Sequence, residues 1–100
     1  RGEDWRGAGR YLAREVRPGD GVAAPGVTGL LRYYFPRIDR HAVDLTAIPG
    51  ASADRVLAVR TRFMTAAERD QLDRLAKRSR SRRTMEFIGI RVDICDGLWH

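Results

Sequence analysis

The first apolar pattern along the chain repeats at helical spacing over residues 4–17. Its apolar side chains share one stripe, formed by Trp5, Ala8, Leu12, Ala13 and Val16. Arginines line the opposite side, so the pattern predicts an amphipathic helix with one face against a core. Asp4 is placed to cap the first turn, and the turn Pro18-Gly19-Asp20 ends the helix.

A short buried strand is predicted at residues 21–25, followed by a glycine-containing turn and a short helix over residues 30–35. Thr28 lies near the N-cap of this helix, and Pro36 is expected to end it. A strand, a glycine turn and a helix start can together bind a phosphate. Gly26, Thr28 and Gly29 are therefore loop candidates, although no complete phosphate-binding motif is present and an ordinary connection is the alternative.

Two further strands are predicted at residues 42–46, which alternate, and at residues 55–60, which have a continuous apolar centre. About eight residues separate them, whereas a parallel crossover needs about a dozen or more. Either the two strands are antiparallel, or the first is short and the crossover is an irregular loop.

The clearest helix start is the capping box formed by Thr65 and Glu68. The apolar stripe of this helix consists of Ala67, Leu72, Leu75 and Ala76. A basic run at residues 77–83 is predicted to end the helix and continue as a loop. From Thr84 onward, apolar residues at even positions predict the last strand, in which Gly89 permits a bulge or a close approach.

These elements predict a single α/β domain over residues 1–100. We expect a small Rossmann-like layer sandwich with about four mostly parallel strands and helices on the faces, resembling half of a doubly wound nucleotide-binding domain. The predicted sheet core is Val56, Leu57, Val59, Ile90 and Val92.

The charge balance adds a preference for anionic partners, because 19 Lys and Arg residues oppose 13 acids and give a net charge of +6. An arginine-rich composition also follows from a GC-rich genome, so the charge alone is weak evidence. No apolar run is long enough to span a bilayer. The chain starts at Arg1 without an apolar signal segment, and we expect it to be a fragment of a longer protein.

Five cations of the basic run are candidate ligands for anionic lipid or phosphate: Lys77, Arg78, Arg80, Arg82 and Arg83. Each basic residue near an anionic surface contributes about 1 kcal/mol to binding. A solvated helix end is the alternative. Nucleic acid is an unlikely partner, because the run has no interleaved aromatic residues that could stack on bases.

The remaining polar and aromatic residues do not predict a catalytic centre. Tyr33 and Tyr34 could stack on a sugar ring, but packing in the core is the favoured interpretation. Nothing in the sequence brings together two of the aspartates, which are Asp39, Asp44, Asp93 and Asp96. Cys95 has no redox or nucleophile motif and is expected to be buried and inert. We therefore predict no catalytic residue, no metal site and no cofactor.

A family resemblance covers nearly the whole chain. It rests on three segments in the expected order: residues 4–12 (DWRGAGRYL), then Arg17-Pro18-Gly19-Asp20, then Tyr33-Tyr34. In these segments the chain closely resembles the C-terminal domain of bacterial polytopic glycosyltransferases, of the protein O-mannosyltransferase and aminoarabinose-transferase-like class. Residues 55–59 and the ending Phe87-x-Gly89-x-x-Val92 also fall in the expected order. The chain departs from the family at Ala23-Ala24, where bulkier residues are usual.

The resemblance implies a domain that follows the last transmembrane helix, on the extracytoplasmic face of the cell membrane. The parent enzyme would use polyprenyl-phosphate sugar donors to build cell-envelope glycans or glycoproteins, with its chemistry in the membrane module. This domain would be non-catalytic, with the transmembrane module as its partner and anionic lipid or lipid-linked sugar as a possible ligand. The alternative is a cytosolic α/β domain that binds a nucleotide or nucleic acid.

Overall fold

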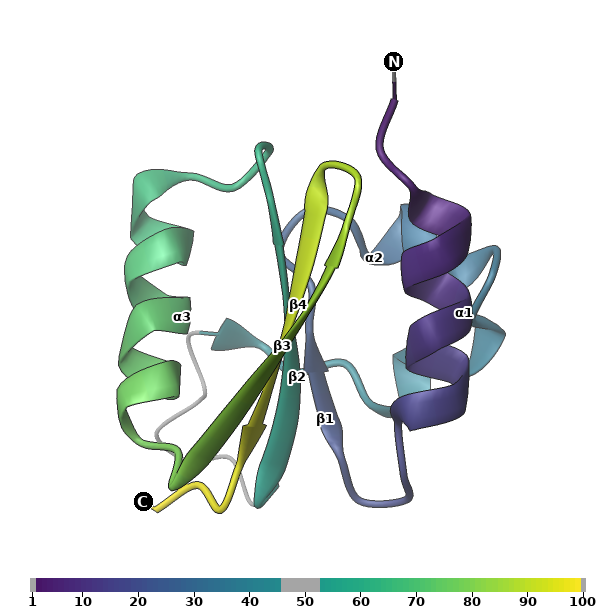
Figure 1. Ribbon diagram of the computed structural model, residues 1–100. Helices are drawn as coiled ribbons and strands as arrows, with labels where there is room; N and C mark the ends of the chain where they lie inside the picture. Colours follow the sequence, from purple (N-terminus) through teal and green to yellow (C-terminus); the bar gives the residue numbers. More distant parts are fainter. Residues whose placement is uncertain (1, 46–52, 100) are drawn as a thin grey trace.

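A mixed sheet of four strands, in the order β1-β2-β4-β3, lies at the centre of the computed structural model, which describes residues 2–45 and 53–99 (Figure 1). Its strands are β1 (Gly21–Ala23), β2 (Arg55–Thr61), β3 (Ser81–Phe87) and β4 (Ile90–Asp96). The predicted α/β class with four strands and flanking helices is confirmed. The prediction of mostly parallel strands is wrong, because β1 and β2 are parallel but β4 is antiparallel to both β2 and β3.

The antiparallel half of the sheet arises from a hairpin between β3 and β4. Ile88 and Gly89 form its turn, and Phe87 pairs with Ile90. Gly89, the second residue of the turn, has a φ of 70°, a conformation that glycine adopts without strain. The predictions of a loop through the basic run and of one strand from Thr84 onward are therefore corrected, since β3 already begins at Ser81.

Helices α1 (Trp5–Glu15) and α2 (Thr28–Arg32) and the 3-10 helix η1 (Pro36–Arg40) cover one face of the sheet (Figure 1). Their fully buried side chains include Leu12, Leu31, Phe35 and Ile38. The predicted stripe of the first helix is confirmed: Ala8 and Leu12 are buried and Trp5, Ala13 and Val16 are partly buried in the same core. Asp4 caps α1, since its Oδ1 accepts a hydrogen bond from Gly7 N at 2.8 Å.

Helix α3 (Ala66–Lys77) covers the opposite face (Figure 1). Its predicted capping box is confirmed, with Glu68 N donating to Thr65 Oγ1 at 3.1 Å and Thr65 N donating to Glu68 Oε1 at 2.9 Å. Leu72 and Leu75 are buried as expected, but Ala67 is exposed, because it lies on the outer side of the first turn.

All five predicted sheet-core residues are buried, at 3% exposure or less. The strand predicted at residues 42–46 is reduced to one parallel bridge between Ala42 and Val22, and Thr46 lies outside the described residues. Thr28 is the first residue of α2, next to its N-cap Val27, as expected. Pro36 does not end α2, because α2 has already ended at Arg32 and Pro36 begins η1. Across residues 2–45 and 53–99, no helix has both the length and the apolar character that crossing a bilayer demands.

Candidate functional site

A groove of about 570 Å³ lies between the last turns of α3 and the start of β3. Asp73, Ala76 and Lys77 line it from the helix, and the residues that follow line its other side: Ser79, Arg80, Ser81 and Arg82. Lys77 lies in the last turn of α3 as the dipole favours. The structure thus brings Lys77, Arg80 and Arg82, which are three of the five candidate cations, to one concave surface.

These three cations are available to a ligand. In the described part of the chain, the side chains of Lys77, Arg80 and Arg82 form no ion pair. Asp73, the one acid among the described lining residues, is held by Arg60 Nη2 at 2.7 Å. The groove therefore presents excess positive charge with hydroxyl groups beside it, a combination suited to phosphate oxygens.

The other two candidate cations lie elsewhere. Arg83 follows Arg82 in β3, so strand alternation directs it to the opposite face, where its Nη2 lies 3.5 Å from Glu15 Oε1. Arg78 is the C-cap of α3. Its Nε and Nη2 are enclosed and find no hydrogen-bond partner among the described residues. The structure therefore places three of the five candidate cations at the groove and the other two away from it.

Behind the groove, a polar network ties α3 to the sheet. Arg60 of β2 donates from Nε to Asp93 Oδ2 at 2.9 Å and from Nη2 to Asp73 Oδ1 at 2.7 Å. Thr84 of β3 donates to Asp93 Oδ1 at 2.8 Å. Although Asp93 alternates with apolar residues in the sequence, it is only 3% exposed. It lies under α3 because the sheet is covered on both faces.

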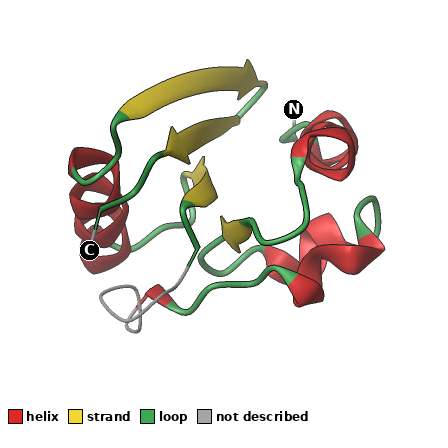
Figure 2. Cartoon of the chain, turned by 90° about the horizontal axis from the view of Figure 1, so that it is seen from below, coloured by secondary structure: helices red, strands yellow, loops and turns green. Residues whose placement is uncertain are grey.

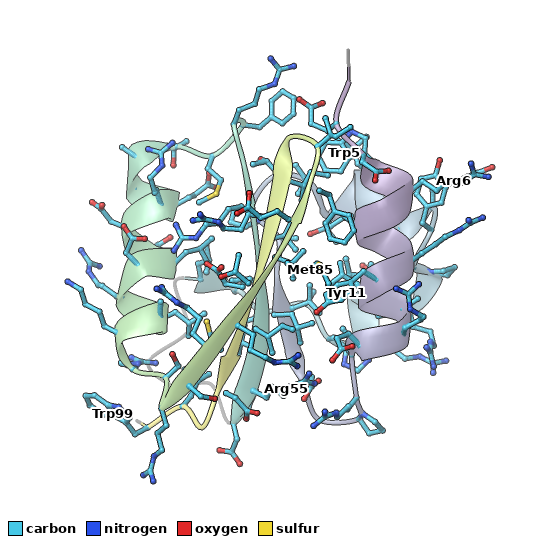
Figure 3. All side chains as sticks on the ribbon, in the orientation of Figure 1. Trp5, Arg6, Tyr11, Arg55, Met85 and Trp99 are labelled. Carbon is cyan, nitrogen blue, oxygen red and sulfur yellow. The ribbon has the colours of Figure 1, made fainter. Side chains whose placement is uncertain are left out.

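A second buried ion pair joins the sheet to the α1 side. The Arg55 guanidinium bonds the carboxylate of Asp20, and its Nη2 lies 3.3 Å from Glu15 Oε1 (Figure 3). Asp20 also accepts a hydrogen bond from Arg17 N at 2.8 Å. The pair spans 35 positions, so no local pattern in the sequence signals it. It fixes the turn after α1 to the start of β2.

The glycine loop is a poor phosphate site. Gly26 has a φ of 72°, Thr28 Oγ1 donates to Ala24 O at 3.2 Å, and Gly29 is exposed. Gly26 and Thr28 border a crevice of about 400 Å³ that Asp44 and Glu68 also line, and these acids oppose a phosphate. Helix α2 has only five residues, too few for a strong dipole.

The two tyrosines do not form a flat stacking platform. Their rings meet edge to face with centroids 4.9 Å apart, and Tyr33 is 82% exposed. Tyr34 is half-buried, and its Cβ comes so close to α1 that only a glycine fits at Gly9. The packing interpretation is therefore wrong for Tyr33, whereas the next aromatic residue, Phe35, is buried.

The groups considered for catalysis are engaged or inert. Asp39 forms an exposed pair with Arg32, and Asp96 Oδ1 accepts from Gly97 N at 2.9 Å. Cys95 is buried, and burial, with a smaller effect of nearby Asp93, raises the pKa of its thiol to about 11. Among residues 2–45 and 53–99, no group of three or more His, Cys, Asp or Glu side chains could hold a metal ion.

Comparison of the chain with protein-family models, with curated proteins and with solved structures finds no match in any of the three.

Proposed function

We propose that this chain is a non-catalytic accessory domain of a membrane glycosyltransferase and that its basic groove binds the phosphate of an anionic lipid or a lipid-linked sugar. The carrying observation is a groove of about 570 Å³ lined by Lys77, Arg80 and Arg82, whose side chains pair with no acid among residues 2–45 and 53–99. The sequence resemblance supports the placement of the domain on the extracytoplasmic face, next to a transmembrane module of the same chain.

The electrostatics of the site favour a phosphate over a neutral sugar. Three neighbouring cations attract an anion at long range and can each donate hydrogen bonds to its oxygens. The hydroxyl of Ser81 lies at the same surface and supplies a neutral donor, whereas Ser79 Oγ donates to Ala76 O at 2.6 Å. With about 1 kcal/mol from each cation at an anionic surface, three together account for roughly a hundredfold increase in affinity.

The arrangement also supports a binding role rather than a catalytic one. The carboxylates that lie near the groove, Asp73 and Asp93, are both bonded to Arg60. A general acid or base needs access to the substrate and a pKa near the working pH. These two groups neutralise a structural arginine instead. The domain would thus hold or orient a phosphate-bearing ligand while another module performs the transfer.

The experiment is vesicle sedimentation with a matched pair of triple variants. In one, Lys77, Arg80 and Arg82 become glutamine; in the other, the exposed arginines of α1, Arg6, Arg10 and Arg14, become glutamine. Both lose the same charge, but only the first loses the groove cations. We expect the wild-type chain to bind acidic vesicles, more weakly as salt rises. The groove variant should lose about a hundredfold in affinity and the α1 variant only a few-fold.

Three arms of the same experiment separate the sources of phosphate. Neutral vesicles doped with a polyprenyl phosphate test the lipid-linked donor, vesicles with an anionic phospholipid test head groups, and inorganic phosphate tests free anions as competitors. Equal losses in the two variants would mean diffuse charge attraction and would contradict the groove. Tight oligonucleotide or nucleotide binding without lipid binding would favour the cytosolic alternative.

A further inference from the structure

Strand β3 forms a free edge of the sheet. It has seven residues, of which the first six are exposed and Phe87 is half-buried. Figure 2 shows this strand clear of helices on its outer side, and Figure 3 shows Met85 on it. A long exposed edge strand offers unpaired N–H and C=O groups to another strand.

The hairpin determines which backbone groups face outward. Phe87 and Ile90 close a two-residue turn and therefore direct their backbone groups toward each other. Successive residues of a strand direct these groups to alternate sides. The backbone groups of Arg82, Thr84 and Glu86 consequently face the free edge.

The charges along this edge are arranged symmetrically. Arg82 and Glu86 lie two positions before and after Thr84. We propose that β3 pairs antiparallel with β3 of a second copy of this chain, about a twofold axis at Thr84. Arg82 of each copy then faces Glu86 of the other, and Thr84 faces Thr84. Two complementary ion pairs form across the seam.

Neighbouring side chains fit the same register. On the opposite face of the sheet, Arg83 of each copy lies across from Met85 of the other, so the aliphatic part of the arginine covers a methionine that is 42% exposed in the single chain. The Arg82–Glu86 pairs lie on the α3 face, because residues paired across an antiparallel seam share a face.

Other registers are worse. Moving the axis to Arg83 sets Arg83 opposite Arg83, and moving it to Met85 sets Arg82 opposite Ile88. An axis at Arg82 or Glu86 sets like charges against each other, which destabilises a strand pair. The Thr84-centred register alone among these gives both charges a complementary partner across the seam. For Glu86 this partner adds to Arg91 of the same chain, whose Nη2 lies 3.9 Å from Glu86 Oε2.

Pairing about this axis joins the sheets of two copies and leaves both basic grooves on one face, since the axis is perpendicular to the sheet. One strand pair buries less than the roughly 1,200 to 2,000 Å² of a standard stable interface. We therefore expect a weak dimer, with a Kd of about 1 μM to 1 mM.

Analytical ultracentrifugation of the isolated chain and charge-swapped variants tests the proposal. E86R sets Arg82 opposite an arginine, and R82E sets a glutamate opposite Glu86, so each should raise the Kd by about tenfold or more. The double variant R82E/E86R restores opposite charges and should restore dimerisation. D70R makes the same charge change as E86R at an exposed position of α3 and should leave the Kd unaltered.

A wild-type chain that stays monomeric up to about 1 mM overturns the proposal. So does an E86R variant that dimerises like wild type, or a double variant that fails to regain the dimer while its circular dichroism shows an intact fold. In the dimer Arg82 is paired with Glu86 of the other copy, so E86R frees a groove cation as it breaks the dimer. Its vesicle binding is therefore compared with that of D70R, which makes the same charge change and keeps the dimer.

Discussion

Two sets of basic side chains in this molecule have the same chemistry and opposite surroundings. Arg55 and Arg60 lie at the ends of one strand with side chains 6% and 16% exposed, and each bonds two carboxylates. Lys77, Arg80 and Arg82 line an open groove and pair with none of the described acids. The first set connects elements of the fold, whereas the second set is available to a ligand.

The difference follows from the free energy of desolvation. A charge taken out of water needs a bonded counter-charge, and removal of one partner leaves the other buried and uncompensated. A solvated cation needs no such partner and can exchange water for a phosphate. A count of arginines therefore says little about binding until each arginine is assigned to one of these two situations.

The largest effect should come from replacing Arg55 by methionine, which has a similar reach and no charge. Asp20, with a side chain 7% exposed, would lose its cation, and Glu15 would lose its shorter contact. We expect a loss of roughly 3 to 5 kcal/mol of unfolding free energy, as for other broken buried pairs. Urea denaturation followed by circular dichroism measures this change.

The matched control for Arg55→Met is Arg32→Met, which breaks an exposed pair with Asp39. Solvent screens that pair, so its loss should be much smaller. Equal losses in the two variants would show that burial does not separate the two kinds of ion pair in this fold.

Cys95 offers a second test of the effect of burial, because it is an ionisable group on the α3 side of the sheet and forms no ion pair with the described residues. Burial raises the pKa of its thiol from 9.0 to about 11. Between these values the unfolded thiol ionises while the folded thiol keeps its proton. Stability that is present below pH 9 should therefore fall as pH rises toward 11, by roughly 2 to 3 kcal/mol.

The readout for Cys95 is the difference between the stability–pH curves of the wild-type chain and Cys95→Ala. Tyrosines and the lysine also titrate in this range, but they are common to both proteins. Parallel curves from pH 8.5 to 11 would contradict a raised pKa, and so would rapid alkylation of the thiol at pH 9 in the folded chain.

The elements that the sequence predicts well are those with local signals. The capping box of Thr65 and Glu68 fixes the start of α3, and the uninterrupted apolar centre of residues 55–60 identifies β2. Both depend on contacts within a few residues or on burial of a whole strand. Each can be read from a short window of sequence.

The β3–β4 hairpin illustrates what such windows miss. Strand β3 is exposed, so no core selects an apolar alternation in it, and its arginines look like a solvated loop. The informative residue is Gly89, which occupies the second position of a two-residue turn. Recognition of this turn predicts an antiparallel pair, and strand alternation then separates Arg82 from Arg83.

The polar networks could not be predicted from local pattern at all. Asp93 alternates with apolar residues and looks solvent-facing, but α3 covers it. Which carboxylate neutralises Arg55 or Arg60 depends on how distant segments meet. The sequence therefore predicts that this segment is basic, but it does not predict which of its cations line the groove.

The exposed ion pair between Arg32 and Asp39 should respond least of all to a change of conditions. Arg32 holds Asp39 by two hydrogen bonds, of 2.7 Å from Nε and 2.8 Å from Nη2, and these bonds lower the pKa of the Asp39 carboxyl below its ordinary value. The pair therefore stabilises the fold above the ordinary pKa, and this contribution is lost as pH falls through the lowered one. A carbon-detected NMR titration of the Asp39 carboxyl should show the lowered pKa in the wild-type chain. In Arg32→Met, or at high salt, the value should move back toward the ordinary one. If neither change alters the Asp39 pKa, the exposed arginine does not act on the carboxylate despite its two bonds. Burial alone would then decide whether an ion pair in this molecule changes the pKa of its carboxyl group.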